Sequence, residues 1–126
     1  MLQGLRTVIY GVSDIGTAKK WYANVLGLKP YFDEQFYVGF NVGGYELGLD
    51  PNAKPVSSAS AGVVAYWGVE NIEAEFKRLV KLGASEHSSI QEVGDGIKVA
   101  TLLDPFGNIL GLIYNPHFKI CENGQS

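Results

Sequence analysis

The chain has 126 residues and a formal net charge of −3 at pH 7, and 46% of its residues are hydrophobic against 18% charged. This length suits one domain with a single core and leaves no room for a second. The acidic balance gives no basic footprint for nucleic acid or an anionic membrane, and no apolar run approaches the ~18 residues that span a bilayer. The charged fraction is below the roughly 25% of typical soluble domains, so we expect extensive burial in the core or in a homodimer interface.

The chain has one cysteine, Cys121, so an internal disulfide is excluded. The first six residues do not resemble a signal peptide. A cytoplasmic protein is therefore expected. Cys121 lies in a polar tail, and we interpret it as incidental because no neighbour in the sequence would lower the pKa of its thiol.

The first half of the chain predicts one strand, one helix and three further strands. Residues 5–12 are apolar and β-branched, which is typical of a strand. Asp14 is expected to be the N-cap of an amphipathic helix, and Gly27 its left-handed C-cap. The apolar positions of that helix are Ala18, Trp21, Tyr22 and Val25. Three strands are expected over 29–33, 35–41 and 45–49, with Gly43-Gly44 in the last turn.

The second half repeats this order after a turn-rich linker at 51–61. A strand over 62–69 leads into the cap pair Glu70-Asn71 and a second helix, on which Glu73 and Lys77 are expected to pair at i, i+4. The apolar positions of the second helix are Ile72, Phe76, Leu79 and Val80. Strands are expected over 86–92, 97–103 and 109–114, with a hairpin turn at 104–108.

Two offsets support a true repeat of the two halves. Val12 aligns with Val69, and Leu26-Gly27 aligns with Leu82-Gly83. The sequence therefore predicts an α+β fold of two βαβββ modules that form a cupped, barrel-like sheet. The predicted single domain spans 1–120, with modules at 4–50 and 62–115 joined by the linker, and a C-terminal tail at 116–126.

Several motifs resemble the vicinal oxygen chelate superfamily, which includes glyoxalases, extradiol dioxygenases and bleomycin-resistance proteins. The resemblance covers about residues 4–115 and implies the glyoxalase/bleomycin-resistance fold. It says less about activity, because these motifs are mostly cap and turn signals. The motifs are Val12-Ser13-Asp14-Ile15, Trp21-Tyr22, Val25-Leu26-Gly27-Leu28, Tyr45-Glu46-Leu47 and Asp104-Pro105-Phe106-Gly107-Asn108.

The resemblance implies four metal-ligand positions, and these fall at Thr7, Glu46, Val64 and Gly111. Of these only Glu46 is a metal-ligand type, and the two histidines, His87 and His117, lie at none of them. A catalytic metal ion needs about three nitrogen, sulfur or carboxylate donors. We therefore predict that the site binds no metal and that the protein has no cofactor.

Residues of one strand parity share a face of a sheet. This predicts a ligand-binding cleft lined by Thr7, Ile9, Glu46, Gly48, Val64, Tyr66, Gly111 and Ile113. Val64 and Gly111, in place of metal ligands, are expected to make this cleft wide and apolar. Aromatic side chains in it would suit a planar or cationic small molecule, although strand aromatics more often belong to a core. The candidates are Tyr31, Phe32, Phe36, Tyr37, Phe40, Tyr45, Tyr66, Trp67, Phe106 and Tyr114.

Glu46 is the candidate catalytic residue. It is interpreted either as a solvated or paired carboxylate, or as a general base or cation anchor whose pKa an apolar cleft would raise. His87 is expected on the surface of a strand and His117 in the tail.

Three functions follow. The leading hypothesis is a metal-free small-molecule binder of the bleomycin-resistance type, acting as a homodimer. The alternative is a glyoxalase-like lyase or isomerase, metal-independent or with a non-standard metal site, that uses Glu46 as base. A regulatory partner without a working site is the third.

Overall fold

The computed structural model describes residues 1–53 and 63–118. Most of the predicted linker at 51–61 and of the tail at 116–126, including Cys121, lies outside the described residues. Among the helices in those two ranges, none combines the length and apolar character that crossing a membrane requires.

The first module forms a four-stranded sheet with one helix. Its elements are β1 (Thr7–Gly11), α1 (Ile15–Leu26), β2 (Phe32–Glu34), β3 (Tyr37–Val42) and β4 (Tyr45–Asp50). The strand order is β1-β4-β3-β2, with β1 parallel to β4 and the other neighbours antiparallel. Helix α1 packs against β3 and β4.

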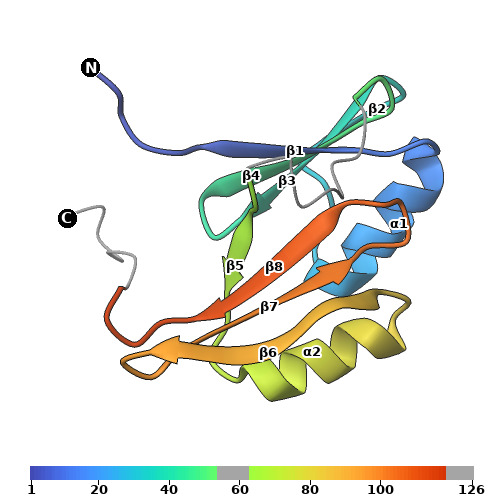
Figure 1. Ribbon diagram of the computed structural model, residues 1–126. Helices are drawn as coiled ribbons and strands as arrows, with labels where there is room; N and C mark the ends of the chain where they lie inside the picture. The colour runs from blue at the N-terminus through green and yellow to red at the C-terminus, as the bar shows by residue number, and fades with distance from the viewer. Residues whose placement is uncertain (54–62, 119–126) are drawn as a thin grey trace.

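The second module repeats this arrangement. Its elements are β5 (Tyr66–Gly68), α2 (Ile72–Lys81), β6 (Ser85–Gly94), β7 (Ile97–Leu103) and β8 (Ile109–Tyr114). The strand order is β5-β8-β7-β6, again with one parallel pair, β5 and β8. Figure 1 shows the two sheets one above the other, with α2 along the underside of the second and α1 at one end between them. The predicted α+β fold of two βαβββ modules is confirmed, and the sheets are cupped but not closed into a barrel.

Local cap chemistry sets the helix ends as predicted. The side chain of Asp14 accepts from the Thr17 amide at 3.1 Å, and that of Asn71 accepts from the Ala74 amide at 3.0 Å, so each satisfies a backbone donor that the first helical turn leaves free. Gly27 adopts φ 67° at the end of α1, a conformation that glycine takes without steric cost.

Three of the local predictions are wrong in these elements. The strand expected at 29–33 begins only at Phe32, because Pro30 has no amide hydrogen for the ladder. Val80 is 43% exposed, since it lies about 80° around the helix from Ile72, at the edge of the apolar stripe. Glu73 pairs with Lys98 at 3.1 Å instead of Lys77, because the neighbouring sheet brings a second lysine within reach.

The two modules share one core, and a buried polar network joins them. The carboxylate of Asp104, in the turn before β8, accepts from the hydroxyl of Tyr22 at 2.6 Å and from the side chain of Asn108 at 3.0 Å. The same Asn108 amide donates to the carbonyl of Gly11 at 2.8 Å. Tyr22 and Asp104 are almost fully buried, so the hairpin of the second module is tied to α1 and β1 of the first.

Candidate functional site

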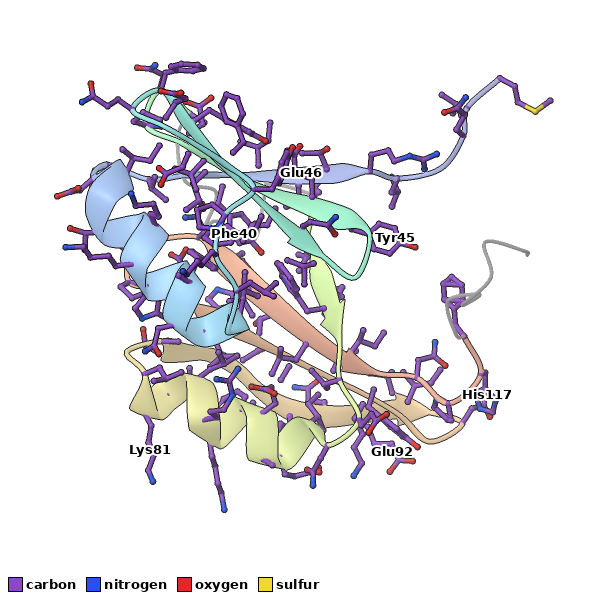
Figure 2. The ribbon with its side chains drawn as sticks, turned by 180° about the vertical axis from the view of Figure 1, so that it is seen from behind. Phe40, Tyr45, Glu46, Lys81, Glu92 and His117 are labelled. Carbon is purple, nitrogen blue, oxygen red and sulfur yellow. The ribbon has the colours of Figure 1, made fainter. Side chains whose placement is uncertain are left out.

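Glu46 lies near the start of β4, on the face of the first sheet that is turned away from α1 (Figure 2). The register places it opposite Thr7 of β1 and Asn41 of β3. Phe40, one residue before Asn41, points to the helix side and is fully buried. The open face of the first sheet therefore carries Glu46 among polar neighbours.

Hydroxyl groups surround the Glu46 carboxylate. Thr7 Oγ1 donates to Oε1 at 2.9 Å, and the Tyr31 hydroxyl donates to Oε2. The Tyr37 hydroxyl faces the same carboxylate and adds a weaker polar interaction. Glu46 is half-buried, so these hydroxyl groups replace part of its hydration.

These donors lower the pKa of Glu46. The hydrogen bond from Tyr31 contributes most to this lowering. Together with the hydroxyls of Thr7 and Tyr37, it outweighs desolvation, which acts to raise the pKa. The expectation of a raised pKa is therefore wrong, because the sequence did not reveal the hydroxyl donors. In turn, burial and the nearby carboxylate raise the pKa of Tyr37 to about 12. The site holds an ionised carboxylate beside two neutral phenols.

Two glycines make room for the tyrosine rings. A Cβ at Gly48 would lie 2.1 Å from the Tyr37 hydroxyl oxygen, and one at Gly39 would lie 2.8 Å from Glu46 Oε2 and 3.0 Å from the Tyr31 ring. Gly39 and Gly48 face each other across β3 and β4. Because neither glycine has a side chain, Tyr31, Tyr37 and Glu46 can pack closely against this part of the sheet.

In the second module, too, a tyrosine ring lies over a glycine. A Cβ at Gly111 would lie 2.7 Å from the Tyr66 ring and 2.7 Å from the Ala65 carbonyl oxygen. The expectation that Gly111 widens the cleft is therefore wrong, because the ring of Tyr66 covers it. Tyr66 itself is 47% exposed, and Ile113 is partly buried.

The predicted cleft residues are brought together within each sheet. Register pairs Thr7 with Glu46 and Ile9 with Gly48 in the first sheet, and it pairs Tyr66 with Gly111 in the second. Val64 precedes β5, so the strand predicted over 62–69 is shorter than expected, and its side chain is 39% exposed. The strand register thus divides the predicted cleft residues into two groups, one on each sheet.

The four positions implied for metal ligands do not fit a metal ion. Thr7 and Glu46 are hydrogen-bonded to each other, and Val64 and Gly111 offer no side-chain donor. The register also shows that Glu46 and Gly111 are not equivalent positions of the two modules. Val12 and Val69 are 57 residues apart, and at this offset Ile9 corresponds to Tyr66. Their strand partners, Gly48 and Gly111, therefore correspond to each other. Within residues 1–53 and 63–118, no three His, Cys, Asp or Glu side chains gather to hold a metal.

The aromatic candidates divide between surface and core. Phe40 is buried in the core, and three further aromatics are partly buried and pack against it: Trp67, Phe106 and Tyr114. These four are therefore not part of the exposed aromatic surface beside Glu46. Tyr31, Phe32 and Phe36 are exposed. The ring of Phe32 lies 6.0 Å from that of Phe36 and 6.1 Å from that of Tyr37, which extends the aromatic surface away from Glu46 along β2 and β3.

Sequence reasoning named Tyr31 and Tyr37 only as aromatics and did not place them beside Glu46. One signal was available for Tyr37, which alternates with Gly39 and Asn41 along β3 and so shares their face. The position of Tyr31, outside any strand, has no such signal. His87 of β6 contacts the Thr101 hydroxyl at 2.9 Å, and His117, in the tail after β8, contacts the Asp95 carbonyl at 2.8 Å. Both therefore contact residues of the second module.

Comparisons with known proteins agree with this architecture. A structure of a superfamily member from Sphaerobacter thermophilus aligns with a TM-score of 0.72 at 21% identity, covering 91% of this chain and 99% of that one. A glyoxalase-related enzyme from Fulvimarina pelagi gives 0.71 at 19% identity, covering 98% and 96%. TioX from Micromonospora sp. ML1 gives 0.63 at 17% identity, covering 93% and 100%. At these identities the likeness concerns the fold alone.

By sequence, no curated protein matches the chain. The family pattern described as "Glyoxalase/Bleomycin resistance protein/Dioxygenase superfamily" matches residues 4–112, which is most of the sequence. Together with the paired βαβββ modules, this establishes that the chain belongs to the glyoxalase/bleomycin resistance protein/dioxygenase superfamily.

Proposed function

We propose that this protein is a metal-free small-molecule binder whose ligand is a cationic, aromatic compound held against Glu46, Tyr31 and Tyr37. The observation that carries the proposal is the carboxylate of Glu46, which accepts hydrogen bonds from the hydroxyls of Thr7 and Tyr31 and whose pKa these donors lower. A fixed negative charge beside exposed aromatic rings attracts a cation by charge pairing and by cation–π contact.

The same observation weighs against the alternative, a glyoxalase-like lyase or isomerase with Glu46 as base. A general base works best when its pKa lies near the working pH, and the pKa of Glu46 is lowered. Its oxygens also already accept hydrogen bonds from Thr7 and Tyr31. An anchoring role needs only the charge.

The proposal includes a cytoplasmic homodimer. Ile9 is 52% exposed and Tyr66 47% exposed, and a second copy of the chain would bury such side chains favourably. Light scattering tests the dimer directly: a monomeric mass at micromolar concentration overturns this part without touching the binding site.

Ligand binding is tested with benzyltrimethylammonium as the probe and benzyl alcohol as its uncharged analogue. We expect the cation to raise the melting temperature in a saturable way and benzyl alcohol to bind at least about tenfold more weakly. Glu46→Gln keeps the size of the side chain but removes its charge. This variant should bind the cation about tenfold more weakly, because it removes the charge pairing with the quaternary ammonium group; tenfold in affinity corresponds to about 1.4 kcal/mol.

Glu92→Gln is the matched control, because Glu92 is an exposed carboxylate of β6 in the other sheet. It should leave binding unchanged. Equal binding of the two probes, or equal loss in both variants, overturns the proposal. Turnover of hemithioacetals or keto acids that disappears in Glu46→Gln would establish the enzymatic alternative instead.

A further inference from the structure

A cavity lies between the two modules. Its volume is about 210 Å³, and its apolar walls come from both modules, through Val25 and Leu26 of α1, Leu79 of α2, Trp67 of β5, and Leu110 and Leu112 of β8. At ~30 Å³ for each water in the liquid, the cavity has room for roughly seven waters. It therefore suits a molecule smaller than a drug-sized ligand.

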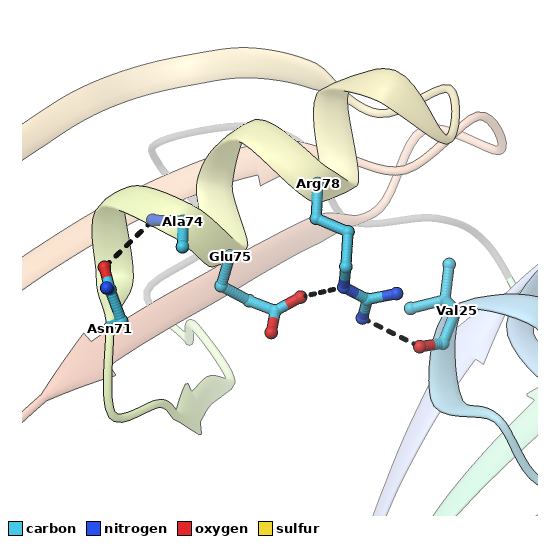
Figure 3. Close-up of polar contacts among 5 residues, drawn as sticks. All are labelled: Val25, Asn71, Ala74, Glu75 and Arg78. Atoms are coloured by element: carbon cyan, nitrogen blue, oxygen red, sulfur yellow. Dashed lines mark hydrogen bonds and ion pairs between the residues drawn. The ribbon is translucent and has the colours of Figure 1, made fainter.

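Two opposite charges from α2 also line this cavity. Arg78 Nε donates to Glu75 Oε1, and Arg78 Nη2 donates to the Val25 carbonyl at 2.9 Å (Figure 3). Helix α1 has no basic residue in its own last turn, so Arg78 supplies the positive charge that the end of a helix favours. The contact also ties α2 to α1.

Each of the two charged side chains has one polar atom that is open to a further hydrogen bond. Within the described part of the chain, Arg78 Nη1 donates to no acceptor and Glu75 Oε2 accepts from no donor. The side chains are 46% and 31% exposed. An exposed pair three residues apart on a helix contributes only about 0.3–0.5 kcal/mol, so sharing it with a ligand costs little.

We propose that this cavity binds an apolar α-amino acid of about leucine size. The carboxylate of the amino acid pairs with Arg78, its ammonium group pairs with Glu75, and its aliphatic side chain packs among Val25, Leu79 and Trp67. A neutral ligand would make no ionic contact with Arg78 Nη1 or Glu75 Oε2, and a ligand with a single charge would use only one of these two atoms. A zwitterion with an apolar side chain matches the pair and the walls together.

Binding here has a structural consequence. The ligand contacts α1 and α2 at once, so it stabilises the packing of one module against the other by mass action. This site is separate from the open face around Glu46 and does not depend on the function proposed there.

The first experiment titrates the full chain with L-leucine and follows tryptophan fluorescence. Trp67 lines the cavity, whereas Trp21 does not and donates its indole hydrogen to the Leu82 carbonyl at 2.7 Å. We expect a saturable change with a dissociation constant in roughly the micromolar to millimolar range, and we expect Trp67→Phe to lose it. A thermal shift gives a second readout in every variant.

Two leucine analogues test the contributions of the carboxylate and the ammonium group separately. Leucinamide lacks the carboxylate, and isocaproate lacks the ammonium group. Glu75→Gln should weaken leucine binding about tenfold but should not weaken isocaproate binding, because the Glu75 carboxylate repels the carboxylate of isocaproate. Arg78→Lys, which keeps the positive charge at the end of α1 but loses the guanidinium fork, should weaken leucine binding about tenfold and leave leucinamide binding unchanged.

The controls are Glu73→Gln and Lys77→Met on the same helix, at positions outside the cavity lining. Both should bind leucine as the parent does, and so should Glu46→Gln. The proposal is overturned if leucine gives no saturable signal up to roughly 10 mM, beyond the range expected for so small a ligand. It is also overturned if the Glu75 and Arg78 variants bind leucine as tightly as the controls.

Discussion

The hydroxyl of Tyr37 lies directly over Gly48, where a Cβ would stand 2.1 Å from the phenolic oxygen. The ring atoms next to the hydroxyl lie 2.6 and 2.8 Å from the same point. A side chain at position 48 and the present position of Tyr37 are therefore mutually exclusive. The polar site around Glu46 depends on the absence of one methyl group in β4.

Gly48→Ala should push the Tyr37 ring away from Glu46 and destabilise the protein by about 1–3 kcal/mol, as overpacking does in well-packed sites. Urea denaturation measures this. The matched test is the same change in a Tyr37→Ala background, where Gly48→Ala should cost little because the ring is gone. Equal costs in the two backgrounds would show that Tyr37 does not restrict position 48.

The pKa of Glu46 gives a pH prediction. Because the carboxyl titrates below its ordinary value of 4.5 in the folded protein, ionised Glu46 stabilises the fold. That contribution is present above pH 4.5 and is lost as the pH falls through the lowered folded pKa. Stability should therefore fall less steeply below about pH 4.5 in Glu46→Gln than in the parent, as followed by denaturation at several pH values.

Tyr31 is the main cause of that lowered pKa. In Tyr31→Phe the pKa of Glu46 should rise toward 4.5, measured by carboxyl-carbon NMR. Tyr45→Phe is the control, because Tyr45 is the neighbour of Glu46 in β4 and points to the opposite face. A Glu46 titration that is identical in the two variants would contradict the hydrogen bond from Tyr31.

The fold was predictable because its signals are local. Asp14, Asn71 and Gly27 mark helix ends by the chemistry of single residues, and the repeat doubles each signal. The site was less predictable, because Tyr31 reaches Glu46 only after β2, β3 and β4 have paired. Strand parity correctly placed Thr7 beside Glu46, but it could not show that rings fill the space over Gly48 and Gly111.

The N-cap of α2 offers a simple quantitative test. Asn71→Ala removes the acceptor of the Ala74 amide and should destabilise the protein by about 1 kcal/mol. Asn24→Ala changes the same residue type within α1, where Asn24 is exposed, and should be neutral or slightly stabilising because alanine has the higher helix propensity. Urea denaturation of both variants makes the comparison, and a larger loss in Asn24→Ala would contradict it.

Asp104 has the largest predicted effect on stability. It is 3% exposed and accepts from the Tyr22 hydroxyl, from the amides of Phe106 and Asn108, and from the Asn108 side chain. Asp104→Ala would leave the Tyr22 hydroxyl buried without an acceptor and should cost about 3 kcal/mol. Asp33→Ala, which breaks only an exposed pair with Lys19, should cost less than about 1 kcal/mol.

Tyr22→Phe separates the hydroxyl from the rest of the Asp104 network. This variant should cost about 1–2 kcal/mol, since it removes one hydrogen bond to a charged group and keeps the packed ring. In the double variant the orphaned hydroxyl no longer exists, so the combined loss should be smaller than the sum of the two single losses. Strict additivity in denaturation would mean that Tyr22 and Asp104 stabilise the two modules independently, which their 2.6 Å hydrogen bond argues against.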